Sequence, residues 1–351
     1  MTVASKTLTC ISPVDGSIFA ERQIMSEVQV NELVTNAKQA QKEWSQRPIG
    51  QRIALVLKGV QRLGEMNEQI VPALAHMMGR PVRYGGEFGG VNERAEYMAK
   101  IAEEALQPLV IEESDDYERR IMREPHGLVF VIAPWNYPYL TAINTIVPAL
   151  IAGNAVFIKH ATQTLLVGET LVSAFVKAGL PEYLFQNLFL DHATTDGLLQ
   201  QRCFDFINFT GSVGGGQAVE RSAAGTFASL GLELGGKDPA YVMNDANLDA
   251  AVEALVDGAM FNSGQCCCGI ERIYVDENLY DAFVHKFVSL VSTYALGSPL
   301  DEASTLGPMA NKRFADEVRA QITEAIDAGA EALIDASLFP RDDGTDAYLA
   351  P

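Results

Sequence analysis

The chain has 351 residues, 48% of them hydrophobic, and this is enough for about two domains that each bury a core. Its 26 Lys and Arg face 45 Asp and Glu, and the formal charge of −19 argues against nucleic acid or an anionic membrane as a partner. The five cysteines are odd in number and three are adjacent, so we expect free thiols in a reducing compartment. Because Met1–Lys6 also lacks the apolar core of a secretory signal, we expect a cytoplasmic protein.

The first third of the chain predicts helices followed by a hairpin. Residues 26–108 have apolar positions at helical spacing with polar residues between them, which indicates a helical layer without chemistry of its own. Residues 109–123 alternate apolar and polar side chains around Asp115 and Asp116, which predicts a two-stranded hairpin.

Residues 127–158 contain no charged side chain and exceed the roughly 20 apolar residues that a membrane helix needs. Prolines and a glycine divide this stretch into a strand at 128–133, a helix at 140–150 and a strand at 155–158. We therefore expect a buried parallel sheet here and no membrane span.

The alternation of helix and strand continues along the chain. Helical pieces at 164–178 and near 194–201 alternate with apolar strands at 185–190 and 204–209. Repeated βα units predict a doubly wound sheet. A second α/β region follows, with predicted strands at 240–243 and 272–275 and helices at 248–260, 280–294 and 312–328.

Two glycine-rich segments have features of phosphate-binding loops. Thr210–Gly216 follows a predicted strand and opens a helix, where backbone N–H groups and the helix dipole can bind a pyrophosphate. Its spacing departs from G-x-G-x-x-G, and the sterics of a tight turn explain such glycines equally well. Gly231–Lys237 nearly matches the ATPase pattern G-x-x-x-x-G-K-[ST], but Asp238 replaces the hydroxyl that would hold Mg²⁺, so we discount an ATPase.

Three consecutive cysteines, Cys266, Cys267 and Cys268, follow a Gly–Gln pair. Adjacent side chains point in different directions, so we expect one nucleophile whose two neighbours are buried. Glu233 lies 34 residues before Cys267, and a thiol with a carboxylate suits covalent catalysis followed by hydrolysis. Two alternatives remain open. The cysteines could be small buried hydrophobic residues, or a zinc site, although no histidine lies near them in sequence.

Five motifs occur in order: Pro134–Pro138 (PWNYP), Lys159, Phe209–Ser212 (FTGS), Leu232–Lys237 (LELGGK) and Gly264–Cys268 (GQCCC). This series resembles that of the aldehyde dehydrogenase superfamily, and the resemblance extends from about Ile11 to the last residue. It implies an α/β fold with a Rossmann-like, doubly wound cofactor domain, an α/β catalytic domain and a small β-hairpin for oligomerisation.

The resemblance also implies domain limits. Residues 1–108 and 124–233 would form the dinucleotide-binding domain, 109–123 the oligomerisation hairpin and 234–351 the catalytic domain. The assembly implied is a homodimer or homotetramer, and the implied partner is a small aldehyde substrate.

The resemblance assigns catalytic roles to three residues. Cys267, the second residue after the Gly–Gln pair, would attack the aldehyde carbonyl. The side-chain amide of Asn136 and the backbone N–H of Cys267 would stabilise the oxyanion. After hydride transfer, Glu233 would act as general base on the water that hydrolyses the thioester to a carboxylic acid.

The implied cofactor is NAD or NADP, and no metal is expected. The implied cofactor-binding residues are Trp135, Lys159, Thr162, Gly211, Ser212, Gly216 and Gly235. Lys159 would contact the adenosine ribose, Ser212 and the helix start near Gly216 the pyrophosphate, and Gly235 would lie near the nicotinamide. Many NAD-preferring members have Glu where this chain has Thr162, and the absence of that acid leaves NADP admissible.

The end of the chain departs from the family pattern. Residues 346–351 resemble the start of a catalytic-domain strand, and the later Glu-Ile-Phe-Gly-Pro motif is absent, so we expect the fold to be unfinished there.

Residues 159–161 and 306–310 resemble the bacterial succinate-semialdehyde dehydrogenase branch, which makes succinate semialdehyde a candidate substrate. Alternatives are an acylating dehydrogenase that passes the thioester to coenzyme A, a cysteine hydrolase, and a non-catalytic dinucleotide-binding fragment. An acylating enzyme would not need Glu233, and a hydrolase would need a histidine beside Cys267 and no nicotinamide cofactor.

Overall fold

The computed structural model describes residues 6–351, so Met1–Ser5, on which the expectation about a secretory signal largely rests, lie outside the described residues. The chain forms two compact units. Unit 1 comprises the described residues up to Leu8, with Glu21–Asn67 and Glu87–Glu233, and unit 2 comprises Thr9–Ala20, Glu68–Gly86 and Leu234–Pro351. Two segments from the N-terminal part of the chain thus pack with unit 2, which local periodicity does not indicate.

Unit 1 contains a five-stranded sheet in the order β7-β6-β5-β8-β9. The strands are β5 (Leu128–Ala133), β6 (Ala155–His160), β7 (Phe185–Asn187), β8 (Phe206–Gly211) and β9 (Ser229–Leu234). β5 pairs in parallel with both β6 and β8, and β6 pairs in parallel with β7. Every residue of β5 and β6 is buried, which explains why the run up to Ile158 lacks charge; Lys159, near the end of β6, is the exception. The predicted doubly wound parallel sheet is confirmed, while β9 was not predicted.

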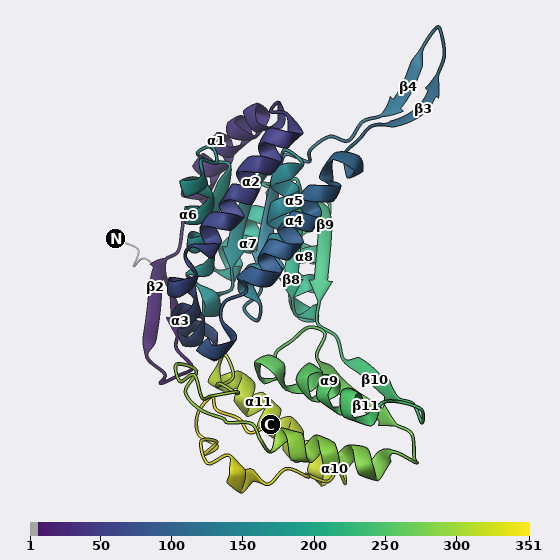
Figure 1. Ribbon diagram of the computed structural model, residues 1–351. Coiled ribbons are helices and arrows are strands. Elements are labelled where there is room, and N and C mark those ends of the chain that lie inside the picture. The colour runs from purple at the N-terminus through teal and green to yellow at the C-terminus, as the bar shows by residue number, and fades with distance from the viewer. Residues whose placement is uncertain (1–5) are drawn as a thin grey trace. The chain divides into compact units, whose positions relative to one another are not determined.

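Helices cover both faces of this sheet (Figure 1). Four of them, α2 (Ile49–Gly64), α4 (Phe88–Ala105), α5 (Pro138–Ile151) and α6 (Val167–Ala178), pack against one another. A further pair, α7 (His192–Gln200) and α8 (Val213–Ala223), also pack together, and α1 (Glu27–Ser45) contacts β5 and β6. Within residues 6–351, no helix combines the length and apolar character needed to cross a membrane.

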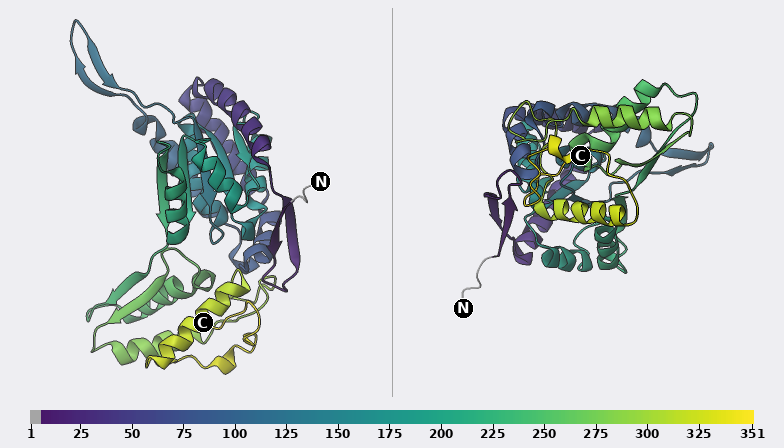
Figure 2. Two further views of the ribbon diagram at one scale, coloured as in Figure 1. Left: turned by 180° about the vertical axis from the view of Figure 1, so that it is seen from behind. Right: turned by 90° about the horizontal axis from the view of Figure 1, so that it is seen from below.

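The predicted hairpin is present as β3 (Leu109–Glu113) and β4 (Glu118–Ile121). These strands pair antiparallel from Leu109 opposite Ile121 to Glu113 opposite Glu118, and all their residues are exposed. Both views of Figure 2 show the hairpin as a separate ribbon that extends away from the sheet of its own unit.

Unit 2 contains a second parallel pair, β10 (Asp238–Val242) and β11 (Ile270–Val275). Helices α9 (Leu248–Met260) and α10 (Tyr280–Val291) pack together around a core that includes Val242, Val256 and Phe283. Unit 2 also contains α11 (Lys312–Asp327) and most of α3 (Asn67–Met78). The expectation of a strand beginning in residues 346–351 is wrong, because the backbone there forms bends and coil.

A small sheet and four short turns complete the described chain. β1 (Thr7–Ile11) and β2 (Ile18–Gln23) form a two-stranded sheet that was not predicted. Single 3₁₀ turns occur at Val82–Tyr84, Thr162–Thr164, Phe261–Gly264 and Ala336–Leu338.

His160, the last residue of β6, connects that strand to the start of α5. Its Nε2 lies 3.1 Å from the carbonyl oxygen of Pro138, which can only accept, so Nε2 is protonated and donates. Its Nδ1 then accepts from the hydroxyl of Thr164 at 2.8 Å and from the N–H of Ala161 at 3.1 Å. The ring is neutral, and burial lowers the pKa of His160 from 6.5 to about 4.

Replacing His160 with Gln should flatten the acid side of the stability profile. Because the unfolded chain binds this proton at pH 6.5 and the folded chain only at about 4, the stabilisation is complete above pH 6.5 and lost as the pH falls toward 4. The full effect is roughly 3 kcal/mol. Denaturant unfolding across this range should show a steeper loss for the wild type than for His160→Gln; identical slopes would contradict a neutral buried imidazole.

Phe204 supports the core beneath the sheet, with its ring stacked on Phe130 at a centroid distance of 4.2 Å and only 1% of its surface exposed. Phe204→Ala should lower the free energy of unfolding by about 3–5 kcal/mol, because the cavity removes apolar contacts on several sides. Phe227, which is 89% exposed, provides the control. Phe227→Ala should change unfolding by less than about 0.5 kcal/mol, and equal losses in both variants would show that Phe204 is not a core residue.

Candidate active site

The strand order of unit 1 reverses direction at β5. The chain proceeds from β5 outward to β6 and β7, then returns to β8 on the other side of β5. In open parallel sheets, ligands bind outside the carboxyl ends of the strands at this point of reversal. Three predicted motifs follow these ends. Trp135 and Asn136 follow β5, Thr162 follows β6, and Gly211 with Ser212 ends β8.

Asn136 is half-buried in the segment between β5 and α5. Its Oδ1 accepts a hydrogen bond from the N–H of Tyr137 at 3.0 Å. This contact orients the amide, because the NH₂ end must then point away from that N–H. The orientation suits a donor to an oxyanion, which is the predicted role of Asn136.

Lys159 is the first polar residue of buried strand β6, with only 7% of its surface exposed. Desolvation lowers the pKa of Lys159, and the carboxylate of Asp191 partly opposes this shift. Asp191 also caps α7, where it accepts from the N–H of Thr194 at 2.8 Å. A buried ammonium at the carboxyl edge of the sheet is a good partner for hydroxyl or phosphate oxygens.

Ser212 is the N-cap of α8, and its Oγ accepts from the N–H of Gly215 at 3.2 Å. Gly216 is buried and donates its N–H to the carbonyl of Ser212 at 2.9 Å. The N–H of Gly216 is thus already used within the helix, and the contribution of this helix start to pyrophosphate binding stays a prediction. The donors at this helix start are those of Val213 and Gly214, and a Cβ on Gly214 would meet open space.

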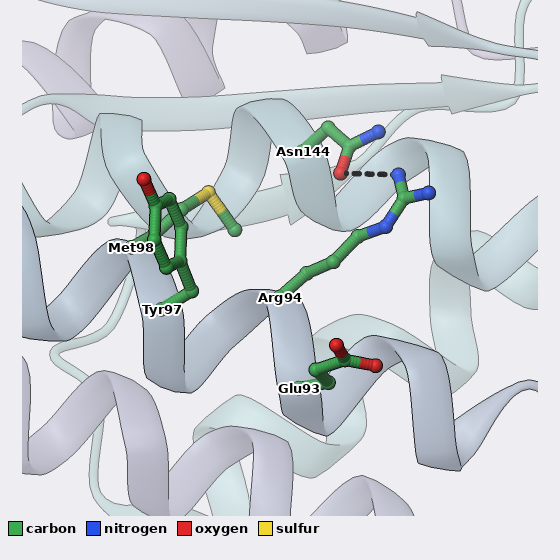
Figure 3. Close-up of a pocket in the computed structure, with 5 residues that line it drawn as sticks. All are labelled: Glu93, Arg94, Tyr97, Met98 and Asn144. Atoms are coloured by element: carbon green, nitrogen blue, oxygen red, sulfur yellow. Dashed lines mark hydrogen bonds between the residues drawn. The ribbon is translucent and has the colours of Figure 1, made fainter.

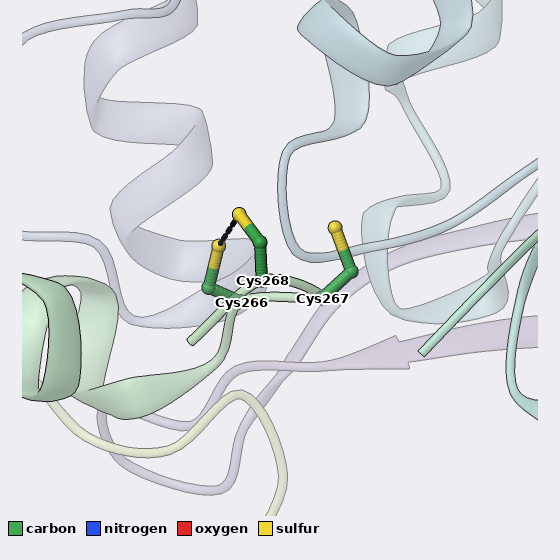
Figure 4. Close-up of side chains that lie close together, drawn as sticks. All are labelled: Cys266, Cys267 and Cys268. Carbon is green, nitrogen blue, oxygen red and sulfur yellow. Dashed lines mark hydrogen bonds between the residues drawn. The ribbon is translucent and has the colours of Figure 1, made fainter. Parts of the chain in front are cut away.

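The three cysteines form a β-turn rather than a strand or a helix. The N–H of Gly269 donates to the carbonyl of Cys266 at 3.3 Å, and this contact closes the turn. Cys266 is half-buried, whereas Cys267 and Cys268 are exposed. The expectation of buried neighbours is therefore wrong, because side chains of a turn do not alternate between opposite faces. Figure 4 shows Cys266 and Cys268 side by side, with Cys267 pointing apart from them.

The alternative of three buried hydrophobic residues fails for the same reason. For a metal, the three sulfurs lie within 4.8 Å of one another, but among the described residues no histidine or carboxylate joins them. A thiol donor set without a fourth protein ligand does not match a structural zinc site. Cys267 and Cys268 are both exposed, and the role of Cys267 as the nucleophile stays a prediction.

The backbone before this turn adopts an unusual left-handed conformation. Asn262, Ser263 and Gly264 have φ values of 55°, 56° and 71°. Two consecutive non-glycine residues in this region cost conformational energy, and such strain persists only where neighbouring contacts enforce it.

Gln265 supplies those contacts. Its Nε2 donates to the carbonyl of Asn262 at 2.9 Å, and its Oε1 accepts from the N–H of Ala310 at 2.9 Å. The Nδ2 of Asn262 donates a hydrogen bond to the carbonyl oxygen of Gln265 at 3.3 Å. The positioning roles of Gln265 and His160 were not predicted from the sequence, where Gln265 stood out only as part of a motif. The adjacent Gly–Gln pair was the available signal.

Glu233 and Gly235 lie on either side of the point where unit 1 gives way to unit 2. Glu233 is exposed in β9, and Gly235 is exposed between β9 and β10. The next residue, Gly236, lies beside the cysteine turn, since a Cβ built on it would be 3.6 Å from the carbonyl oxygen of Cys267. The pairing of Cys267 with Glu233 and Asn136 stays a prediction.

A surface hollow of about 430 Å³ lies elsewhere on unit 1, lined by residues of α4 and by Asn144 of α5. Figure 3 shows Arg94 of this hollow directed at Asn144, whose Oδ1 accepts from Nη1 at 3.0 Å. None of the predicted site residues lines it, so it is not a candidate for the active site.

Comparison with known proteins identifies the family of the chain. The model described as "Aldehyde dehydrogenase family" matches residues 1–351. A succinate-semialdehyde dehydrogenase (NADP⁺) of Deinococcus radiodurans is 29% identical over 91% of this chain and 67% of its own length. A vanillin dehydrogenase of Corynebacterium glutamicum is 31% identical over 95% of this chain and 70% of its own length.

Solved structures share the fold. The crystal structure of PnpE in complex with nicotinamide adenine dinucleotide has a TM-score of 0.91 and 28% identity, covering 99% of this chain and 72% of that one. Because the family model matches residues 1–351 of this chain, the chain belongs to the aldehyde dehydrogenase family.

Proposed function

We propose that this aldehyde dehydrogenase oxidises a small aldehyde to the carboxylic acid through a thioester on Cys267, with NAD⁺ or NADP⁺ as the hydride acceptor. The observation that supports this most strongly is the exposed Cys267 thiol, presented on a turn that Gln265 holds in place. A relative named for NADP(+) and a solved structure bound to nicotinamide adenine dinucleotide support either cofactor.

The carboxyl edge of the sheet in unit 1 fits a dinucleotide. Lys159 offers a buried ammonium, whose desolvation cost falls when a ribose hydroxyl or phosphate oxygen contacts it. The N–H groups of Val213 and Gly214 at the start of α8 fit a pyrophosphate. Thr162 at the end of β6 adds no negative charge, so a 2′-phosphate is tolerated there.

Cys267 begins the reaction by adding its thiolate to the aldehyde carbonyl. The Asn136 amide and the Cys267 N–H would stabilise the negative oxygen of the resulting thiohemiacetal. Lys159 and the start of α8 would hold the dinucleotide, and its nicotinamide would supply the acceptor for the hydride that leaves the former aldehyde carbon. A thioester then joins the acyl group to the Cys267 sulfur.

Glu233 would activate the water that hydrolyses this thioester. Its backbone precedes that of Gly236 by three residues, and the chain spans at most about 3.6 Å per residue, so Glu233 stays within roughly 11 Å of Gly236. Gly236 in turn lies beside the Cys267 carbonyl. This covalent tether supports Glu233 as the base, and it favours hydrolysis over transfer of the acyl group to coenzyme A.

The substrate is proposed at the level of small aldehydes. Succinate semialdehyde is one candidate, since a relative is named for it, but another similar relative is named for the aromatic aldehyde vanillin. We further propose that β3 and β4 contribute to a homodimer or homotetramer, because apolar Leu109, Val110 and Ile111 are each at least half exposed there.

The direct test is NAD(P)H formation, followed by absorbance, by the purified chain with NAD⁺ and NADP⁺ in parallel. The panel should contain succinate semialdehyde, an aromatic aldehyde and simple aliphatic aldehydes. Turnover with at least one pair supports the proposal. Cofactor binding without turnover on every aldehyde would favour a non-catalytic dinucleotide-binding fragment, and ester hydrolysis without cofactor would favour a cysteine hydrolase.

Substitution of the three cysteines should separate their roles. Cys267→Ala should lower turnover by about 10³-fold or more while cofactor binding persists, because no other thiol takes its place. Cys266→Ala and Cys268→Ala should each cost less than about tenfold, since neither sulfur bonds to the substrate. Equal losses in all three variants would refute Cys267 as the sole nucleophile.

Glu233→Gln should uncouple acylation from hydrolysis. Rapid mixing should show one burst of NAD(P)H per active site followed by a stall, because the amide cannot take a proton from water. Glu271, a neighbouring exposed carboxylate paired with Lys237, provides a matched control, and Glu271→Gln should keep steady turnover. Steady wild-type turnover in Glu233→Gln would exclude Glu233 as the base.

A further inference from the structure

The turn at Cys266–Gly269 brings two sulfurs into contact that the proposed reaction does not use. The Sγ atoms of Cys266 and Cys268 are 3.3 Å apart, and Figure 4 shows both on the same side of the turn. Neither residue is buried, so a small reagent can reach them. The other two cysteines, Cys10 and Cys203, are buried in unit 2 and unit 1 respectively.

We propose that Cys266 and Cys268 form a redox-active dithiol, which a low-molecular-weight disulfide oxidises to a reversible intramolecular disulfide while Cys267 remains a free thiol. This modification site goes beyond the proposed dehydrogenase reaction, in which only the Cys267 sulfur takes part. It depends on the shape of the turn and does not require the enzyme to be active.

Geometry selects this pair among the three cysteines. A disulfide bond is about 2.0 Å long, so the two sulfurs need to approach by little more than 1 Å from their present contact. Cysteines at positions i and i+2 of a turn have side chains that converge across one intervening residue. Directly adjacent cysteines would instead close a small ring through a single peptide bond, whose planarity resists that closure.

The hydrogen bond between the two thiols also sets the order of events. The pKa of Cys268 is raised to about 11, chiefly by its hydrogen bond and charge interaction with Cys266. Cys268 therefore keeps its proton at neutral pH, and we assign the first attack to Cys266. Cys268 acts second, on the mixed disulfide that Cys266 has formed.

The two steps balance in atoms and electrons. The Cys266 thiolate attacks one sulfur of R–S–S–R, forms Cys266–S–S–R and releases the first R–S⁻. Cys268 then loses its proton and attacks the Cys266 sulfur, which forms the Cys266–Cys268 bond and releases the second R–S⁻. The two thiols are oxidised by two electrons, the reagent is reduced, and the two released protons convert both leaving groups to R–SH.

Oxidised glutathione tests the proposal on the full chain. After incubation and an acid quench, the remaining thiols are alkylated with N-ethylmaleimide and the protein is digested with trypsin, which releases all three cysteines in peptide 238–272. We expect this peptide to contain one disulfide and one alkyl group, with fragmentation placing the alkyl group on Cys267. Dithiothreitol should restore three alkylated cysteines.

Single variants supply the controls. Cys266→Ser removes the thiol that attacks first, so it should yield no disulfide between Cys267 and Cys268. Cys268→Ser should instead retain a glutathione adduct on Cys266, because no second thiol closes the ring. Cys203→Ser should behave as the wild type. A wild-type disulfide that includes Cys267, a persistent adduct without ring closure, or three unmodified thiols after treatment would each overturn the proposal. The readout is a mass, so inactivity toward aldehydes would leave this test intact.

Discussion

The chemistry of unit 1 depends on one constraint: parallel strands end at a common edge. Because β5, β6 and β8 pair in parallel, the segments that follow them meet although they are separated by dozens of residues in sequence. Strand β6 is wholly buried, so its polar end must be satisfied internally, and the neutral ring of His160 does this by bonding to Pro138 and Thr164. Lys159, the residue before it, is thereby held at the same edge with a depressed pKa.

The reactive turn of unit 2 is held by a different means. Backbone strain at Asn262 and Ser263 is balanced by the buried side chain of Gln265, which bonds to both the left-handed turn and the N–H of Ala310. The conformational energy of the left-handed backbone is confined to this segment. The turn that follows it leaves the Cys267 side chain exposed instead of packed. The same turn brings Cys266 and Cys268 into contact, so one backbone geometry accounts for both the proposed nucleophile and the proposed dithiol.

Much of the fold and part of the candidate site could be predicted from the sequence. The elements and burial that were missed or wrongly predicted have physical explanations. The uncharged run at 127–158 identified β5, α5 and β6 because buried parallel strands require continuous apolar residues. Edge strand β9 was not predicted because its largely exposed residues lack that continuous apolar pattern. The packing of Thr9–Ala20 with unit 2 was not predicted because it joins segments far apart in sequence, which local periodicity does not indicate. The burial expected for Cys266 and Cys268 was wrong because it assumed regular structure where the chain turns.

The proposed function depends on covalent catalysis at one sulfur among three neighbours. The most direct test is to mix the wild-type enzyme with an aldehyde that it oxidises, to quench the reaction with acid during turnover, and to locate the acyl group by peptide mass spectrometry. If Cys267 is the nucleophile, we expect an acyl mass on Cys267 that appears only when both aldehyde and dinucleotide are present. An acyl group on Cys266 or Cys268, or an enzyme that turns over with no acylated cysteine at any quench time, would contradict it.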